Sequence, residues 1–155
     1  MSDQILERTQ RIGLPADEVF DLFGDAFNLE RITPPWLRFR VLTPAPIEMG
    51  EGTLLEYRLR LHGIPVRWCT RITAWDPPRR FVDEQISGPY ALWHHTHTFE
   101  PDGDATVIRD RVRYRIGFGP LGALALWLFV RRDVERIFDY RREAMLRLIS
   151  ERSST

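Results

Sequence analysis

The sequence contains no lysine, because all 22 of its basic side chains are arginine. A Schiff-base lysine, the lysine of a phosphate-binding loop and a Ser–Lys dyad are therefore excluded. Cysteine is almost absent too: Cys69 stands alone, which excludes an internal disulfide and any cysteine cluster for zinc or iron–sulfur. The longest apolar run, Leu121 to Val130, is far shorter than the ~20 residues that span a bilayer. We therefore expect no stable membrane insertion.

Net charge is also lacking, because 22 acidic side chains balance the 22 basic ones. Arginine often contacts phosphates and bases, but a nucleic-acid-binding protein normally carries a net basic field. We therefore expect no nucleic-acid partner. Glycine-rich phosphate loops and Gly-x-Ser-x-Gly motifs are missing, and we expect no cofactor. The first residues lack the apolar segment of a signal peptide, so we expect a cytoplasmic protein.

A length of 155 residues fits one domain, 1–155, that buries a core of its own. Aromatic residues are plentiful, at 12% of the chain, with five Trp and nine Phe. Such side chains fill cores, and they also line concave pockets for apolar ligands. The composition therefore favours a globular domain and is compatible with a ligand pocket.

The residue pattern predicts a strand, two short helices, about six further strands and one long helix. The first strand covers 4–14, and Pro34-Pro35 ends the second of the helices expected at 15–23 and 25–32. Alternation then predicts strands near 39–43, 55–61, 67–72, 81–86, 92–100 and 106–116. Apolar residues at helical spacing predict the long helix over 131–149.

Strands with one apolar and one charged face are typical of an antiparallel sheet that is covered on one side. We therefore predict an α+β fold in which a strongly curved sheet of about seven strands wraps around the C-terminal helix. A cavity between sheet and helix is expected. Most strand arginines fall on the outer face, where we expect them to be solvated, and Trp75 is the aromatic expected on that face.

The apolar segment Phe118 to Val130 permits several interpretations. Gly119-Pro120 is typical of a helix start, so the segment could form the first part of the long helix, buried against the sheet. A lid over the cavity, a transient membrane contact through Leu121–Val130 and a dimer surface are the alternatives. Monomer and homodimer both stay open.

Several local motifs add to this element order. They are Asp76-Pro77-Pro78-Arg79-Arg80-Phe81-Val82-Asp83-Glu84-Gln85, Gly88-Pro89-Tyr90, Trp93-x-His95-x-His97-x-Phe99, Asp110-x-Val112-x-Tyr114 and Gly119-Pro120-Leu121-Gly122. Together they resemble the SRPBCC superfamily, which includes START and birch-pollen-allergen proteins, in its bacterial polyketide cyclase-like, ligand-binding branch. The resemblance implies a helix-grip fold with a cavity for a hydrophobic small molecule or lipid. It fixes no activity, since members range from carriers to aromatase/cyclases.

A polar cluster is predicted inside the cavity. Side chains alternate between the two faces of a strand, so Trp93, His95, His97 and Phe99 share one face. We assign this face to the interior because its aromatic residues are large and apolar. The same alternation predicts that Phe81, Asp83 and Gln85 on the preceding strand face inward. It predicts the same for Asp110, Val112 and Tyr114 on the following strand. Neighbouring strands then bring six polar side chains together: Asp83, Gln85, His95, His97, Asp110 and Tyr114.

This cluster could be a hydrogen-bonded structural network, or it could orient polar groups of a ligand. It could also act as a general acid and base, with His95, His97, Asp110 and Asp83 as the catalytic candidates. Two His and one Asp could bind zinc or iron. A lone His-x-His pair is common, however, and we predict no metal. Whether the protein is an enzyme is left open.

We predict that the domain binds a hydrophobic or aromatic small molecule, lipid- or polyketide-like. Expected ligand-binding residues are Tyr57, Leu59, Trp68, Phe81, Asp83, Gln85, Trp93, His95, His97, Phe99, Asp110, Val112, Tyr114, Ile137, Phe138 and Arg141. If Arg141 reaches inward, an acidic or phenolate group on the ligand is the better expectation. The alternatives are a cyclase/dehydratase-type enzyme that uses a His/Asp pair, and a protein-interaction module with a vestigial cavity.

Overall fold

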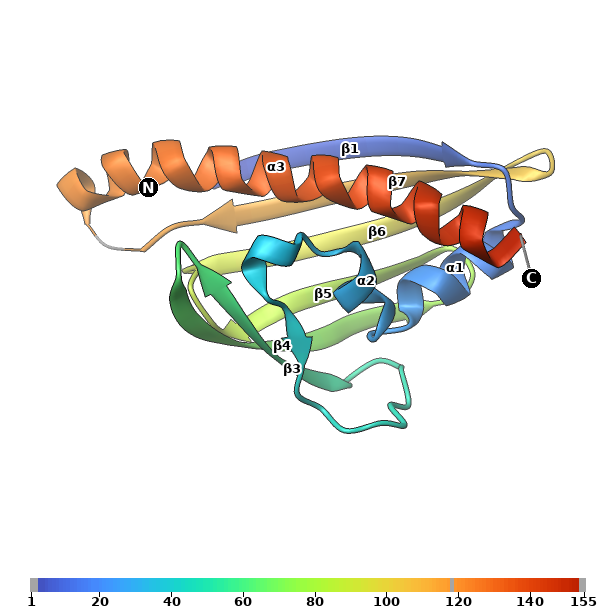
Figure 1. The fold of residues 1–155 in the computed structure, drawn as a ribbon, viewed down its shortest axis with the longest axis horizontal. Coiled ribbons are helices and arrows are strands. Elements are labelled where there is room, and N and C mark those ends of the chain that lie inside the picture. Colours follow the sequence, from blue (N-terminus) through green and yellow to red (C-terminus); the bar gives the residue numbers. More distant parts are fainter. Residues whose placement is uncertain (1–2, 118, 154–155) are drawn as a thin grey trace.

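Seven antiparallel strands form one curved sheet that packs against a long C-terminal helix (Figure 1). The computed structural model describes residues 3–117 and 119–153, without the side chains at 121–123, 125, 126 and 153. The elements are β1 (Gln4–Ile12), α1 (Ala16–Gly24), α2 (Asn28–Ile32), η1 (Pro35–Leu37), β2 (Arg40–Val41), β3 (Leu54–Leu61), β4 (Ile64–Asp76), β5 (Arg80–Ser87), β6 (Leu92–Asp102), β7 (Ala105–Arg115) and α3 (Pro120–Ser153). The strand order is β1-β7-β6-β5-β4-β3-β2. The predicted α+β helix-grip class is confirmed.

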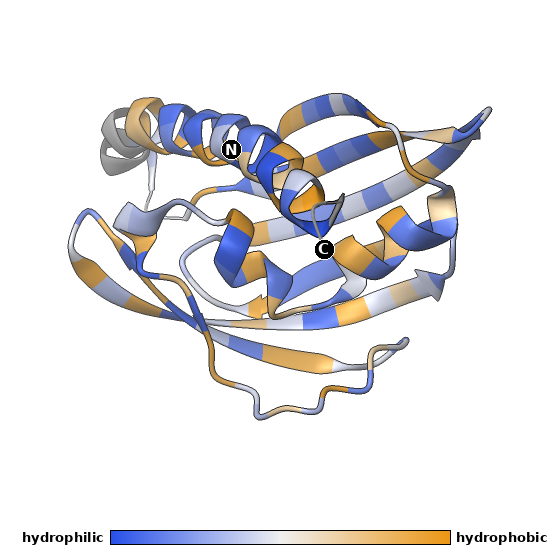
Figure 2. Ribbon diagram, turned by 45° about the vertical axis from the view of Figure 1, so that its right-hand side comes forward, coloured by the Kyte–Doolittle hydropathy of each residue, from blue (hydrophilic) through white to orange (hydrophobic). Residues whose placement is uncertain are grey.

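The sheet is antiparallel because short turns join consecutive strands from β3 to β7. His62 and Gly63 take φ values of 50° and 81° in the β3–β4 turn, and Gly103 takes 61° in the β6–β7 turn. Each strand alternates hydrophobic and hydrophilic residues along its length (Figure 2). In β3, for example, Leu55 and Tyr57 are buried whereas Arg58 is exposed. This alternation gives the sheet one face toward α3 and one toward solvent.

Trp75 departs from the prediction that places it on the outer face. The register of β4 against β5 shifts between Ile72 and Ala74, so the alternation of side chains changes phase there. The Trp75 ring consequently packs edge-on against Phe20 of α1, with 5.0 Å between ring centroids, and contacts Phe81 at 5.5 Å. The prediction for Trp75 was wrong, because the alternation of residues in the sequence does not reveal a β-bulge.

The second helix is shorter than predicted. It begins at Asn28 rather than Asp25, because Asp25 accepts a hydrogen bond from the backbone N–H of Phe27 in a turn that precedes the helix. The prolines end it as expected, and Pro35 opens the short η1 turn, which the pattern did not predict. In this segment α1 contacts β6 and β7, α2 contacts α3, and η1 contacts β3. It supplies part of the cavity wall described below.

The apolar segment before residue 131 forms the beginning of α3, which runs without interruption from Pro120 to Ser153. The expectation that it is buried against the sheet is wrong for three of its side chains. Leu124, Leu128 and Phe129 are each more than 60% exposed, because this end of the helix projects past the sheet (Figure 1). Phe118 and several side chains of this segment lie outside the described residues. Lid, membrane contact and dimer surface stay predictions.

No helix in the described part of the chain is long and apolar enough to cross a membrane.

Candidate functional site

A partly open cavity of about 130 Å³ lies between the sheet and α3. Its wall comes from β3 to β6, from the segment between α1 and β2, and from the middle of α3. The lining side chains are mainly apolar, and Asp83, His95, His97 and Arg141 form its main polar region. Predicted residues in this wall are Tyr57, Leu59, Trp68, Phe81, Asp83, Trp93, His95, His97, Ile137, Phe138 and Arg141.

Five residues expected in the wall lie outside it. Gln85 turns away and holds the Tyr90 backbone, donating to its carbonyl at 2.7 Å and accepting from its N–H at 3.1 Å. Phe99, Val112 and Tyr114 belong to the packed core on either side of the cavity. Asp110 lies behind the two imidazoles, bound to His95. All five lie at strand positions that face the inner side of the sheet, as predicted. They are outside the wall because the cavity occupies only part of that side.

Other wall residues were missed. Leu55, Leu61, Thr70 and Ile72 lie on strands and face the same side as the predicted set, so the alternation could have identified them. The rest come from turns and from the segment after β1, whose position against the sheet leaves no periodic signal. They are Phe23, Ala26, Leu29, Thr33, Leu37, Phe39, Met49 and Tyr90.

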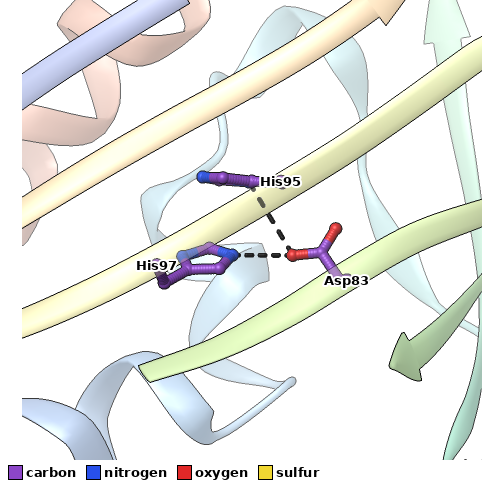
Figure 3. A group of neighbouring side chains, drawn as sticks. All are labelled: Asp83, His95 and His97. Carbon is purple, nitrogen blue, oxygen red and sulfur yellow. Dashed lines mark hydrogen bonds and ion pairs between the residues drawn. The ribbon is translucent and has the colours of Figure 1, made fainter. Parts of the chain in front are cut away.

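Two carboxylates hold the two inward imidazoles, and Figure 3 shows one of them, Asp83, beside His95 and His97. His97 Nε2 donates a hydrogen bond to Asp83 Oδ2 at 2.6 Å, and His95 Nε2 donates to Asp110 Oδ1 at 2.8 Å. The remaining nitrogens point at the opposite carboxylates: His95 Nδ1 lies 3.7 Å from Asp83, and His97 Nδ1 lies 3.4 Å from Asp110. His97 Nδ1 forms no aligned hydrogen bond with any of the described residues. We call these four side chains the His–Asp cluster.

Strand register explains why the cluster forms. Asp83 pairs with His95 across β5 and β6, and His97 pairs with Asp110 across β6 and β7. Residues two apart on a strand share a face, so the imidazoles lie next to each other, stacked with 3.6 Å between ring centroids. Phe81 stacks on the other side of His97 at 4.0 Å. Each imidazole is therefore fixed in orientation by a stacked neighbour and by a carboxylate.

The histidines have opposite protonation tendencies. Burial, reinforced by the charge of His97, lowers the pKa of His95 to about 4. Burial also lowers the pKa of His97, but its contacts with Asp110 and Asp83 outweigh burial, and the net pKa is raised. The structure thus favours a neutral His95 beside a protonated His97.

The carboxylates stay ionised. Burial alone would raise the pKa of Asp83, but the hydrogen bond from His97 and the charges of His95, His97 and Arg141 hold that pKa below its usual range. The pKa of Asp110 is also lowered, because contacts with His95 and His97 outweigh its burial. Burial raises the pKa of Tyr57 far above its usual value, so that the phenol stays neutral. With His97 protonated, Arg141 supplies the second positive charge that balances the two carboxylates.

Arg141 reaches inward from α3, which is one of the two directions that the sequence allowed. Its guanidinium lies over the Phe138 ring, 5.1 Å from the ring centroid. Its Nε and Nη1 are buried and have no hydrogen-bond partner among the described residues. A buried N–H without an acceptor costs about 1–3 kcal/mol, and more when the group is charged. The cavity therefore contains a cation whose donors are unsatisfied.

A metal ion is the cofactor that these residues could hold. Asp83, His95 and His97 form the one set of such side chains within the described residues whose ligand atoms all lie within 4.8 Å of one another. Two imidazoles and a carboxylate suit zinc or iron. The same atoms already bind each other, however, and the positive charge of Arg141 acts on Asp83. That charge opposes a dication, so the absence of a metal stays our prediction.

Comparison with protein families identifies the chain. The model of the family described as "Polyketide cyclase / dehydrase and lipid transport" matches residues 12–139. The chain belongs to this family. The match confirms the resemblance to polyketide cyclase-like SRPBCC proteins that the sequence motifs indicated. The sequence has no significant match among curated proteins.

Solved structures share the fold of this polyketide cyclase-like chain. TTHA0849 from Thermus thermophilus is 21% identical, over 94% of this chain and 99% of that one, with a TM-score of 0.68. The Zhui aromatase/cyclase from Streptomyces sp. R1128 is 19% identical over 94% and 96%, with a TM-score of 0.67. A START superfamily protein from Mycobacterium smegmatis is 12% identical over 93% and 98%, with a TM-score of 0.64. At these identities the likeness establishes the fold alone.

Proposed function

We propose that the protein binds a hydrophobic or aromatic small molecule that carries an acidic group, a carboxylate or a phenolate. The apolar part lies in the cavity, and Arg141 holds the acidic group. One observation carries the proposal: the buried guanidinium has two donors without a partner among the described residues, in a wall that is mainly apolar. Guanidinium forms paired hydrogen bonds to carboxylates, and it stays charged when buried.

The size of the cavity narrows the ligand further. An engineered apolar cavity of about 150 Å³ in another protein binds benzene, so the space of about 130 Å³ found here suits one aromatic ring. A lipid- or polyketide-like molecule is larger, and it would extend past the wall or widen it. Thr33, Leu37 and Phe39 are the wall residues on the irregular segment between α2 and β2, where such widening requires the least rearrangement.

The His–Asp cluster would orient this ligand. Asp83, His95 and His97 reach the wall, whereas Asp110 supports both imidazoles from behind. A ligand hydroxyl or carbonyl beside His97 would meet a positively charged ring whose orientation is fixed by its hydrogen bond to Asp83. Phe81, Trp68 and Trp93 supply aromatic surface around it.

Benzoate and benzyl alcohol, which differ in the acidic group, test the role of Arg141. Titration calorimetry should show tighter binding of benzoate to the wild-type protein. Arg141→Met removes the charge and keeps the apolar stem, so benzoate affinity should fall about tenfold or more. Benzyl alcohol affinity should change little.

Arg132→Met is the matched control, because Arg132 is exposed on the same helix. It should leave both affinities unchanged. Equal binding of both compounds to the wild type, or an equal loss of benzoate affinity in both variants, would contradict the proposal.

A cyclase/dehydratase-type reaction is the second candidate. It is supported by the family description, by the structural likeness to an aromatase/cyclase and by the close His97–Asp83 pair at the wall. In such a pair the carboxylate can accept a proton from a ligand carbon next to a carbonyl, and the positively charged imidazole stabilises the resulting enolate. A protein-interaction module with a vestigial cavity is not proposed, because the cavity has open volume and charged groups in its wall.

Deuterium exchange at the methyl group of acetophenone tests the catalytic candidate. The wild-type protein should accelerate exchange, followed by NMR. His97→Gln should reduce the acceleration by about a hundredfold or more, whereas His94→Gln, on the other face of β6, should not. Absence of acceleration by the wild type, or equal rates in the two variants, would reject a catalytic role for the His97–Asp83 pair.

A further inference from the structure

An arginine-lined groove lies next to the cavity, at the edge of the sheet formed by β2 and β3. Its volume is about 610 Å³, and its walls come from the segment between α2 and β2, from β3 and from the start of β4. The charged residues lining it are Glu30, Arg38, Arg40, Arg58 and Arg60. Four guanidinium groups thus face one carboxylate. We call this surface the arginine groove.

The single carboxylate is already occupied. Glu30 Oε1 accepts a hydrogen bond from the backbone N–H of Val41 at 2.8 Å, and Glu30 Oε2 lies 3.6 Å from Arg40 Nη1. Arg38, Arg58 and Arg60 form no ion pair with any residue in the described ranges 3–117 and 119–153. The groove therefore presents three guanidinium groups that no carboxylate in these ranges neutralises.

The sheet register concentrates this positive charge. Arg58 lies directly opposite Arg40 on β2 and opposite Arg67 on β4. Like charges at paired positions repel each other, so the row is unfavourable until an anion binds beside it. Arg58 and Arg60 are two residues apart on β3, and their side chains lie on the same face. A group with several anionic oxygens can contact both.

The groove and the cavity share part of their walls. Thr33, Phe39 and Leu59 line both. The cavity has room for about one aromatic ring, so a larger ligand must continue beyond these side chains, and the groove lies directly outside them. A ligand that fills the cavity and continues past these side chains would place its outer end, with a second anionic group, in the groove.

We infer that the arginine groove is a binding site for a phosphate or diphosphate group, and that the ligand of the cavity carries that group on its outer end. Arginine forks bind phosphate oxygens in pairs, and a doubly charged group suits several guanidinium groups better than one carboxylate does. The link to the cavity rests on the proposed function, but phosphate binding in the groove does not.

Inorganic pyrophosphate tests the groove without any apolar ligand. Calorimetry should show that it binds the wild-type protein and that Arg58→Gln/Arg60→Gln weakens binding about tenfold or more. The control Arg71→Gln/Arg80→Gln removes two charges from exposed arginines outside the groove. It should change the affinity for pyrophosphate less than about threefold at an ionic strength of about 0.15 M, where the Debye length is about 8 Å. No binding, or an equal loss in both double variants, would overturn the site.

A phosphate ester with a flexible aromatic tail tests the connection to the cavity. Phenylbutyl phosphate should bind about tenfold or more tightly than inorganic phosphate, because its ring is buried in the cavity. It should also shift the indole N–H signals of Trp68 and Trp93 in NMR spectra. Equal affinities for phenylbutyl phosphate and inorganic phosphate would overturn the link between groove and cavity. The proposed function is tested separately, by the binding of benzoate to the wild type and to Arg141→Met. Tighter binding of a single-stranded oligonucleotide than of pyrophosphate would overturn the assignment to a small ligand.

Discussion

Replacement of Asp110 by alanine is expected to lower the free energy of unfolding by about 3–5 kcal/mol. Asp110 accepts the hydrogen bond from His95 and lies 3.4 Å from His97, while both imidazole side chains are only 4% exposed. Without it, Arg141 and a protonated His97 face Asp83 alone. His97 would then lose its proton or remain as an uncompensated buried charge, and either outcome destabilises the fold.

Urea unfolding at neutral pH measures this effect, and two variants provide the comparison. Asp110→Asn keeps a hydrogen-bond acceptor for His95 and should retain part of the stability that alanine removes. Asp102→Ala breaks the exposed ion pair with Arg11, 3.0 Å long, and should cost less than about 1 kcal/mol. If Asp110→Ala proved no more harmful than Asp102→Ala, the charge balance that we assign to the cluster would be wrong.

Acidification is expected to remove about 3 kcal/mol of stability between pH 6.5 and pH 4, through His95 alone. In the folded protein the pKa of His95 is lowered to about 4, whereas in the unfolded chain it returns to its ordinary value of 6.5. Within this window the unfolded state binds a proton that the folded state does not. Stability therefore falls as the pH falls from 6.5.

The other members of the cluster act in separate pH ranges. Asp83 and Asp110 have lowered pKa values, so their contribution is present above the unfolded value of 3.8 and is lost as the pH falls below it. His97 has a raised pKa, so its contribution is complete below 6.5 and is lost as the pH rises through its folded pKa. Stability should therefore peak near pH 6.5 and decline on both sides.

Urea titrations at pH 7, 6 and 5 with His95→Asn separate the contribution of His95 from the rest. The wild type should lose stability between pH 6 and 5 with a slope of up to about 1.4 kcal/mol per pH unit, and the variant should lose much less. Asparagine can still donate a hydrogen bond to Asp110, so the fold should persist. A wild-type stability that stays constant from pH 7 to pH 5 would refute the neutral state of His95.

The candidate site was partly readable from the sequence. The alternation in β5, β6 and β7 was sufficient to place Asp83, His95 and His97 on the inner face, because side chains two residues apart on a strand must share a face. It also turned Asp110 toward them. The same rule failed at Trp75, where a bulge shifts the phase, and it could not place the segment between α1 and β2.

Arg141 marks the limit of this reasoning. Its position on a helix next to Phe138 left its direction open, and only the packing of α3 on the sheet turned its guanidinium into the cavity. That packing also left Nε and Nη1 without acceptors among the described residues, which is the observation behind the proposed acidic ligand. The shared wall between cavity and arginine groove likewise depends on how an irregular segment lies against β3.

The absence of lysine, the near absence of cysteine and the alternation of the strands by themselves determined which chemistries were excluded and which fold class to expect. Periodicity is a property of each segment, so it can be read from the sequence without knowledge of the fold. Tertiary structure decided which inward side chains meet, how their charges balance and where space remains. Those properties depend on distances between segments far apart in the sequence, and the pattern of any one segment does not contain them.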